Sequence, residues 1–332
     1  MIEYMENKTI KKIGVLTSGG DAPGMNAAIR AVVRAGFYYN LEVFGIYRGY
    51  EGMINNDIRK MDSKSIAHVL ERGGTFLKSA RSAEFRTPEG RKKAYENLKS
   101  NGIDALVVIG GDGSLTGAHL FYKEFGIPAV GLPGTIDNDL FGTDLTIGFD
   151  TACNTAIQAI DKIRDTATSH DRLFFIEVMG RDAGFIAINA GIGSAAAAIL
   201  IPEKKMPVEM LLERLKNREK AKKESNIVIV AEGGKSGGAT EIADKVRKIL
   251  PTYDIKVTIL GHLQRGGAPS AFDRTLASKL GVSAVEGLLQ GKYDVMVGVI
   301  NNKIVFTPIK RAIVDDKKVD EEELRIANIL ST

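Results

Sequence analysis

The feature that most constrains the fold is a regular alternation of short apolar runs with longer amphipathic stretches. The runs are rich in Val, Ile and Leu and end at glycine or polar residues, which is typical of strands buried on both faces. Because helices fall between them, the strands form parallel sheets with right-handed crossovers, covered by helices on both faces. The pattern predicts a doubly wound, Rossmann-like α/β fold that binds ligands at the carboxyl ends of its strands. The expected strands are 12–17, 43–47, 105–109, 128–132, 174–178, 198–201, 227–231, 257–260 and 295–300.

Length and composition narrow the class of protein. A chain of 332 residues exceeds one typical domain, so we expect two lobes. The net charge of +4 is too small to indicate a protein that binds nucleic acid or a membrane surface. No apolar stretch approaches the ~20 residues of a membrane helix. The single cysteine, Cys153, cannot form an internal disulfide, which favours a reducing, cytoplasmic setting.

Two glycine-rich loops follow the first and third expected strands. These are Thr17–Asn26 and the sequence Gly-Gly-Asp-Gly-Ser at 110–114. We expect Pro23 in the first turn of one helix and Ser114 at the cap of another. Glycines let the backbone approach a phosphate, and free amides at a helix start attract the anion. Two such loops predict a polyphosphate ligand, with Asp112 as a candidate Mg²⁺ ligand.

Three other nucleotide or hydrolase motifs do not fit. Gly19–Gly24 is not followed by Gly-Lys-Ser/Thr, so it is not a Walker A loop. Thr116 occupies the place of the third glycine in a dinucleotide fingerprint, which argues against a dehydrogenase. The sequence at 234–238 matches a nucleophile elbow by pattern, but no acid and histidine follow it in a persuasive order.

The loop 133–139 contains the candidate base. Asp137 and Asp139 lie two residues apart just beyond an expected strand. A single aspartate here would fit an ordinary turn. Two of them near a phosphate cradle suit a base that takes a hydroxyl proton and a partner that supports the site. The sequence therefore predicts a carboxylate base beside the phosphate-binding loops.

Together with 146–150, 179–181, 231–233 and 260–267, these loops resemble the bacterial 6-phosphofructokinases in order and spacing, from about residue 12 to about residue 302. The resemblance implies a glycolytic kinase that transfers the γ-phosphoryl of ATP to the 1-hydroxyl of fructose 6-phosphate. It also implies Mg²⁺ as cofactor and an allosteric, cytoplasmic homotetramer. We expect no nucleic-acid or membrane partner.

The resemblance also implies a role for individual residues. Asp137 matches the proton acceptor, Thr135 lies near the transferred group, Asp139 supports the site, and Arg81 and Arg181 neutralise developing charge. The metal ligand is Asp112. The ATP site comprises Gly20, Tyr50, Arg81, Ser82, Arg86, Gly111, Asp112, Gly113, Ser114 and Gly117. The sugar-phosphate site comprises Thr135, Ile136, Asp137, Met179, Gly180, Arg181, Glu232, His262, Leu263, Gln264 and Arg265, with Arg172 and Lys256 from a neighbouring subunit.

The sequence departs from the family pattern at two places. Lys256 stands where arginine is usual, and a lysine loses the two-pronged grip on phosphate, which predicts weaker binding of fructose 6-phosphate. In the effector site, Ala197 replaces an acidic residue and Ala221 a basic one, which predicts a weakened or altered response to ADP or phosphoenolpyruvate. The matching effector residues are Arg30, Arg34, Arg164 and Lys223.

We expect residues 1–148 plus 262–310 to bind ATP and residues 149–261 plus 311–332 to bind fructose 6-phosphate, with the active site in the interlobe cleft. Pyrophosphate-dependent members carry Asp and Lys where this chain has Gly113 and Gly134, so the sequence favours ATP. A kinase of the NAD or lipid type would share the Gly-Gly-Asp-Gly-Ser loop, but the loop with Asp137 argues against it. A nucleotide-sensing paralogue without activity would be expected to lack Asp137 or Asp112.

Overall fold

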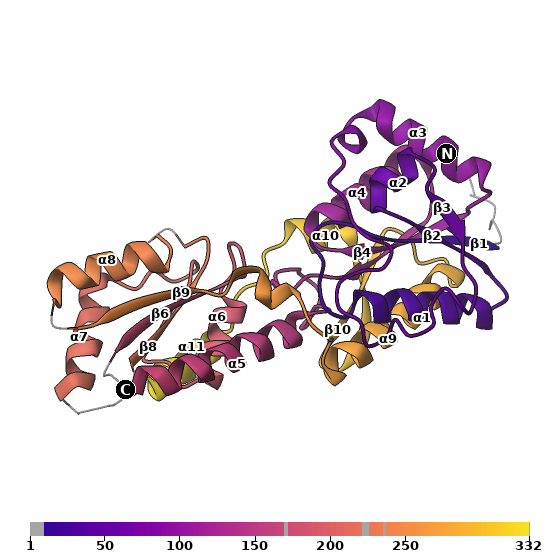
Figure 1. The fold of residues 1–332 in the computed structure, drawn as a ribbon. Coiled ribbons are helices and arrows are strands. Elements are labelled where there is room, and N and C mark those ends of the chain that lie inside the picture. The colour runs from indigo at the N-terminus through magenta and orange to yellow at the C-terminus, as the bar shows by residue number, and fades with distance from the viewer. Residues whose placement is uncertain (1–9, 169–171, 221–225, 235–236, 252, 332) are drawn as a thin grey trace. The chain divides into compact units, whose positions relative to one another are not determined.

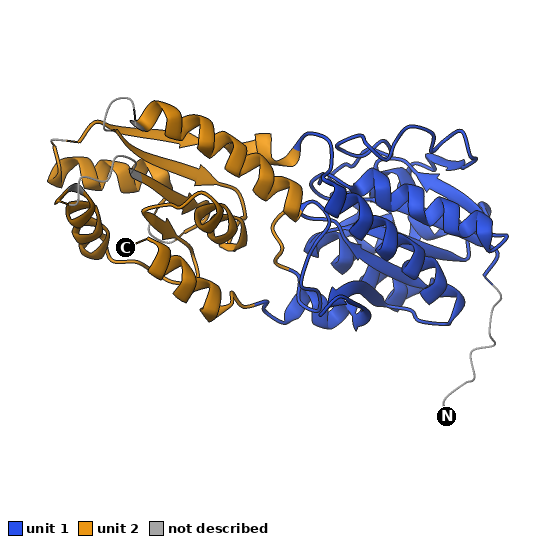
Figure 2. Cartoon of the chain, turned by 90° about the horizontal axis from the view of Figure 1, so that it is seen from below, with its two compact units in different colours: residues 1–135, 140–148, 266–317 blue, residues 136–139, 149–265, 318–332 orange. Residues whose placement is uncertain are grey.

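The computed structural model describes residues 10–168, 172–220, 226–234, 237–251 and 253–331 (Figure 1). They divide into two compact units (Figure 2). Unit 1 holds residues 1–135, 140–148 and 266–317, and unit 2 holds residues 136–139, 149–265 and 318–332. Within the described ranges, no helix is both long and apolar enough to span a bilayer.

Unit 1 is built on a seven-stranded sheet of order β11-β10-β5-β4-β1-β2-β3. The five inner strands pair in parallel, while β3 and β11 pair antiparallel at the two edges. Their bounds are β1 Lys12–Thr17, β2 Glu42–Ile46, β3 Ile58–Lys60, β4 Ala105–Gly110, β5 Ala129–Pro133, β10 Val295–Ile300 and β11 Lys303–Pro308. All residues of β4 and β5 are buried, as expected for strands covered on both faces.

Helices cover both faces of this sheet. On one face α1 (Met25–Tyr38) packs on α9 (Ala271–Leu289). On the other, apolar side chains of β1, β2 and β4 form a core with α2 (Gly49–Ile54), α3 (Pro88–Ser100), α4 (Asp112–Phe125) and α10 (Ile309–Val314). A short 3₁₀ helix, η1 (Glu84–Arg86), precedes α3. This arrangement leaves the loops after β1, β4 and β5 at one edge of the sheet.

Unit 2 has a four-stranded parallel sheet of order β7-β8-β6-β9. The strands are β6 Leu173–Val178, β7 Ala198–Leu200, β8 Asn226–Ala231 and β9 Ile255–Ile259. Side chains of α7 (Val208–Lys220) and α8 (Ala239–Ile249) form a core with one face of this sheet. The remaining helices are α5 Phe149–Thr168, α6 Phe185–Gly193, η2 Gly261–Arg265 and α11 Glu321–Leu330. Of these, α6 packs on α5, β8 and α11.

The nine expected strands are all present, and the doubly wound α/β class is confirmed. The unit bounds differ from the expected lobes. Residues 136–139, expected in the first lobe, count with unit 2. Because η2 packs on α5, it counts with unit 2, and because α10 packs on α4, it stays with unit 1. The two expected helix starts were wrong. α1 begins after Gly24, whose left-handed φ of 105° turns the chain, and α4 begins after Gly111, so Ser114 lies within the first turn.

Candidate active site

The carboxyl ends of β1 and β4 form the topological switch point of unit 1. From β1 the chain continues to β2 on one side, and from β4 it continues to β5 on the other, which is where doubly wound sheets bind ligands. Ser18 N donates to Ile109 O at 3.0 Å, so the two loops lie side by side. A Cβ on Gly110 would lie 2.4 Å from Ser114 Oγ, so a larger residue does not fit there. The two predicted phosphate loops are therefore brought together.

The start of α4 is the predicted anion site. The amides of Ser114 and Leu115 bond to Gly111 O at 3.0 and 3.1 Å, while Asp112 and Gly113 are exposed. A Cβ on Gly113 would meet nothing within 4 Å, so the helix start is open. First-turn amides without intrahelical acceptors suit a phosphate. Thr135 lies beside this site, 3.6 Å from the position of a Cβ on Gly111.

Tyr50 packs against the same helix. Its hydroxyl donates to Ser114 O at 2.5 Å, and its ring stacks on Phe85 at 4.0 Å between centroids. Burial raises the pKa of the Tyr50 hydroxyl. A Cβ on Gly117 would lie 2.8 Å from the Tyr50 ring, so glycine leaves room for the ring. Tyr50 and Gly117, both predicted ATP-site residues, therefore pack against each other.

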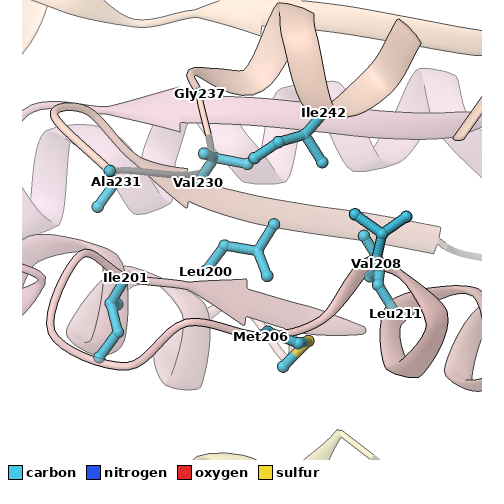
Figure 3. Close-up of a pocket in the computed structure, with 10 residues that line it drawn as sticks. Leu200, Ile201, Met206, Val208, Leu211, Val230, Ala231, Gly237 and Ile242 are labelled. Atoms are coloured by element: carbon cyan, nitrogen blue, oxygen red, sulfur yellow. The ribbon is translucent and has the colours of Figure 1, made fainter. Parts of the chain in front are cut away.

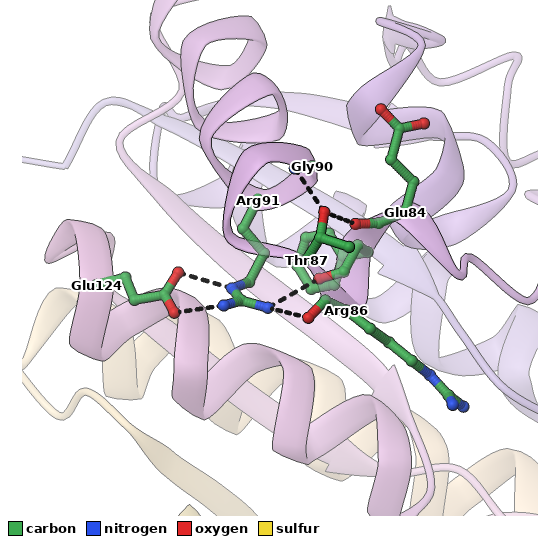
Figure 4. Close-up of polar contacts among 7 residues, drawn as sticks. Glu84, Arg86, Thr87, Gly90, Arg91 and Glu124 are labelled. Carbon is green, nitrogen blue, oxygen red and sulfur yellow. Dashed lines mark hydrogen bonds and ion pairs between the residues drawn. The ribbon is translucent and has the colours of Figure 1, made fainter.

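The backbone at Arg86 is held by Arg91 (Figure 4). Arg91 forms a two-pronged ion pair with Glu124 at 2.6 and 2.7 Å. Its guanidinium also donates to Phe85 O and Arg86 O at 3.1 and 2.8 Å. The side chain of Arg86 is exposed, as is that of Arg81. The backbone of this predicted ATP-binding segment is therefore held, while its two arginines are accessible.

Asp112 is the candidate metal ligand. Within the described ranges, no three His, Cys, Asp or Glu side chains gather as a ready-made metal cage. Mg²⁺ in kinases is usually held by one or two carboxylates, substrate phosphates and water. A single exposed carboxylate at the start of α4 fits that donor set.

In unit 2 the switch point lies at the carboxyl ends of β6 and β8, which pair in register at Val178 and Ala231. Glu232 follows β8, and its Oε1 accepts from the amides of Gly180 and Arg181 at 3.2 and 2.9 Å. This holds the turn after β6, where Gly180 and Arg181 have positive φ of 139° and 54°. Sequence reasoning named these residues as substrate contacts, but the structure adds that Glu232 shapes the turn.

Asp137 is buried beside positive charge. Its side chain is 3% exposed, and Arg181 Nε lies 3.5 Å from Asp137 Oδ2. Burial raises the pKa of Asp137, and Asp139 and Glu232 add to the rise, while Arg265 and Arg181 oppose it. A carboxylate made more basic in this way is suited to accept a proton. The structure thus gathers four predicted residues, Asp139, Arg181, Glu232 and Arg265, around the Asp137 carboxylate.

The other predicted residues of the turn after β9 differ in exposure. His262 and Leu263 are exposed, whereas Gln264 is fully buried and donates to Gly261 O at 3.2 Å. Met179 and Ile136 are buried as well. Gly20 is exposed in the loop after β1.

Arg172 and Lys256 lie at the opposite end of the unit 2 sheet. Arg172 precedes β6 and Lys256 is the second residue of β9, so both lie at the amino ends of their parallel strands. Asp254 joins them, accepting from Arg172 Nε at 2.8 Å and lying 2.7 Å from Lys256 Nζ. The sheet separates this pair from Glu232 and Arg181 of the same chain.

The predicted effector residues are spread over both units. Arg30 and Arg34 lie on α1 of unit 1, whereas Arg164 lies on α5 of unit 2 and donates to Ser194 O. Ala197 is buried. Lys223 and Ala221 lie outside the described residues.

An apolar pocket of about 30 Å³ lies between β7, β8, α7 and α8 (Figure 3). Hydrocarbon side chains dominate its wall, including Leu200, Met206, Val230 and Ile242. Such a lining offers no charged group to a phosphorylated ligand, so the pocket does not belong to the candidate site.

The chain is similar to known proteins along most of its length. A model of the phosphofructokinase family matches residues 12–288. The ATP-dependent 6-phosphofructokinase 2 of Bacteroides thetaiotaomicron is 56% identical over 323 residues, which are 97% of this chain and 99% of that protein. This chain belongs to the phosphofructokinase family. The family expected from the motifs is thereby confirmed.

Solved phosphofructokinase structures share the fold. The phosphofructokinase of Saccharomyces cerevisiae superposes with a TM-score of 0.88 at 42% identity, and covers 91% of this chain. This chain spans only 45% of the yeast chain. A pyrophosphate-dependent phosphofructokinase from Marinobacter aquaeolei superposes with a TM-score of 0.83 at 22% identity, which is a similarity of fold.

Proposed function

We propose that this phosphofructokinase transfers the γ-phosphoryl group of ATP to the 1-hydroxyl of fructose 6-phosphate. The observation that supports the proposal best is the buried Asp137 carboxylate, whose pKa is raised and which faces Arg181. The names of relatives at 51–56% identity also support ATP as donor. Unit 1 would bind ATP and unit 2 would bind the sugar phosphate. That the two substrates react in a cleft between the lobes stays a prediction.

In the proposed mechanism, the oxygen of the sugar hydroxyl bonds to the γ-phosphorus of ATP, and Asp137 accepts the proton of that hydroxyl. The bond between that phosphorus and the bridging oxygen breaks, and ADP leaves with the bond's electron pair. A loose transition state of this kind needs positioning and positive charge around the equatorial oxygens more than it needs covalent chemistry. The bond from the Arg181 amide to Glu232 supports that role for Arg181, and Arg81 is an exposed cation of unit 1. Bound Mg²⁺, with Asp112 as its protein ligand, would neutralise phosphate charge.

The nucleotide would lie on the two glycine-rich loops. The start of α4 offers open amides, and the exposed Arg86 and the partly buried Ser82 come from a segment whose backbone Arg91 holds. Glycine at 113 leaves space for an α-phosphate that a carboxylate would crowd and repel. A Cβ on Gly134 would lie 3.0 Å from both Ile109 and Met25, so a larger side chain there requires those neighbours to move.

The sugar phosphate would be shared between subunits. Arg172 and Lys256 lie at the amino end of the unit 2 sheet, away from Glu232, so they are better placed to serve another copy of the chain. This placement supports the proposed homotetramer. The proposed cytoplasmic location rests on the single cysteine. A weakened effector response also stays a prediction, because it depends on Ala197 and Ala221.

The test is fructose 1,6-bisphosphate formation from fructose 6-phosphate and Mg²⁺, with ATP and pyrophosphate compared as donors. We expect product with ATP alone. If product forms only with pyrophosphate, the proposed donor is wrong and the proposed acceptor, fructose 6-phosphate, is kept. No product with either donor would contradict the proposed function and favour a kinase of the NAD or lipid type.

A further inference from the structure

Asn26, at the start of α1, has a buried side-chain amide whose nitrogen and oxygen both form hydrogen bonds with another loop. It is the second residue of α1, directly after the first glycine-rich loop, and it is 1% exposed. Asn26 Nδ2 donates to Arg72 O and Gly73 O at 3.0 and 3.2 Å, and Phe76 N donates to Asn26 Oδ1 at 2.8 Å. One side chain thus holds three backbone groups of the 72–78 segment.

The other end of the glycine-rich loop holds the same segment. Thr17, the last residue of β1, is fully buried, and its hydroxyl donates to Lys78 O at 3.0 Å. Thr75 Oγ1 lies 2.8 Å from Thr17 Oγ1 and is therefore the donor of that bond. Both flanks of the loop Thr17–Asn26 are tied to one segment.

The 72–78 segment has no regular structure of its own to hold its shape. Gly74 and Lys78 have positive φ of 65° and 60°. Gly73 lies against Gly267, since a Cβ on it would be 2.2 Å from Gly267 O. An irregular segment keeps one conformation only where side chains satisfy its backbone groups. Asn26 and Thr17 supply those bonds.

Arg81 lies three residues beyond Lys78, the last residue of this segment. We infer that Asn26 is a positioning residue, which sets the place of Arg81 relative to the first glycine-rich loop and thereby aids phosphoryl transfer. The inference rests on the proposed function, in which Arg81 neutralises charge on the transferred group. Asn26 does not touch the substrates in this account but acts through the 72–78 segment.

The chain offers a matched control. Asn97 Nδ2 donates to Met53 O and Ile54 O at 2.9 and 2.8 Å, so it too joins a helix to two backbone carbonyls of unit 1. It holds the end of α2 rather than the segment before Arg81. Asn26→Ala and Asn97→Ala each remove two bonds from a side-chain amide to backbone carbonyls, and Asn26→Ala also removes the bond from Phe76 N. Only Asn26→Ala releases the segment that precedes Arg81.

A double-mutant cycle tests the inference. The proteins are the native chain, Asn26→Ala, Arg81→Ala and the double variant, each measured for kcat, both KM values and thermal unfolding. We expect Asn26→Ala to lower kcat by about tenfold or more, with the KM for fructose 6-phosphate within about twofold. In the Arg81→Ala background the same change should cost less than about twofold, because the partner through which it acts is gone. Asn97→Ala should keep kcat within about twofold.

Two results would overturn the inference: losses from Asn26→Ala and Arg81→Ala that multiply, or an equal fall of kcat in Asn97→Ala. If Asn26→Ala does not fold, Thr17→Val enters the same cycle, since it removes only the bond to Lys78 O and the contact with Thr75. A native chain without activity would contradict the proposed function. If the native chain is active but the falls in kcat from Asn26→Ala and Arg81→Ala multiply in the double variant, only the positioning role is contradicted.

Discussion

At the scale of the residue, the environment of Asp137 determines its chemistry. Burial is the largest cause of its raised pKa, and Asp139 adds like charge, while Arg265 and Arg181 favour the ionised form. The balance matters because a base must be ionised to work, yet basic enough to hold the proton it receives.

This balance predicts a pH effect. Activity needs ionised Asp137, so kcat should fall on acidification at a higher pH than the ordinary carboxyl range near ~4 would give. Arg181→Ala removes an influence that lowers the pKa of Asp137, so the acid limb of kcat should move to still higher pH. Arg181→Lys, which keeps the charge, should move the limb less. The pH profile of kcat checks this, and an acid limb that stays in place or moves to lower pH in Arg181→Ala would refute it.

At the scale of the element, the fit of α2 against α4 depends on Gly117. A Cβ there would lie 2.8 Å from the ring of Tyr50, whose hydroxyl bonds to Ser114 O in the predicted ATP site. We expect Gly117→Ala to displace Tyr50 and raise the KM for ATP by about tenfold, with the KM for fructose 6-phosphate unchanged. Steady-state kinetics with both substrates measure this. Leu120→Ala is the control, because Leu120 is an exposed residue of the same helix.

The elements also show how far the sequence could predict the structure. Continuous apolar runs located the nine parallel strands, most clearly β4 and β5, because strands buried on both faces carry few polar residues. β3 and β11 were missed, since edge strands are half-exposed, and β3 is only the three residues Ile58–Lys60. The glycine-rich loops could be predicted because their chemistry is local. Asn26 and Glu232 could not be assigned their holding roles, because their bonds join residues 46 to 52 positions apart.

At the scale of the whole molecule, the positions of Asp137 and Arg172 predict complementation between subunits. Neither Asp137→Asn nor Arg172→Ala should be active alone at low fructose 6-phosphate. In a mixed pair, one site combines a native Asp137 with an Arg172 from the other subunit, as a symmetric interface requires. Equal mixing followed by reassembly should restore about a quarter of native activity, since half of the pairs are mixed and each has one intact site. No recovery in proven hybrids would contradict the shared site.

The most direct measurement of the central claim is kcat of Asp137→Asn with saturating ATP, fructose 6-phosphate and Mg²⁺. Folding raises the pKa of Asp137, so its ionisation opposes folding above the unfolded pKa, and the neutral amide should leave the protein at least as stable at neutral pH. Asp244→Asn, at an exposed ion pair with Arg247 in unit 2, is the control. We predict that Asp137→Asn lowers kcat between about a hundredfold and ten-thousandfold while fructose 6-phosphate still binds. A folded Asp137→Asn variant with kcat near that of the control would contradict Asp137 as the base.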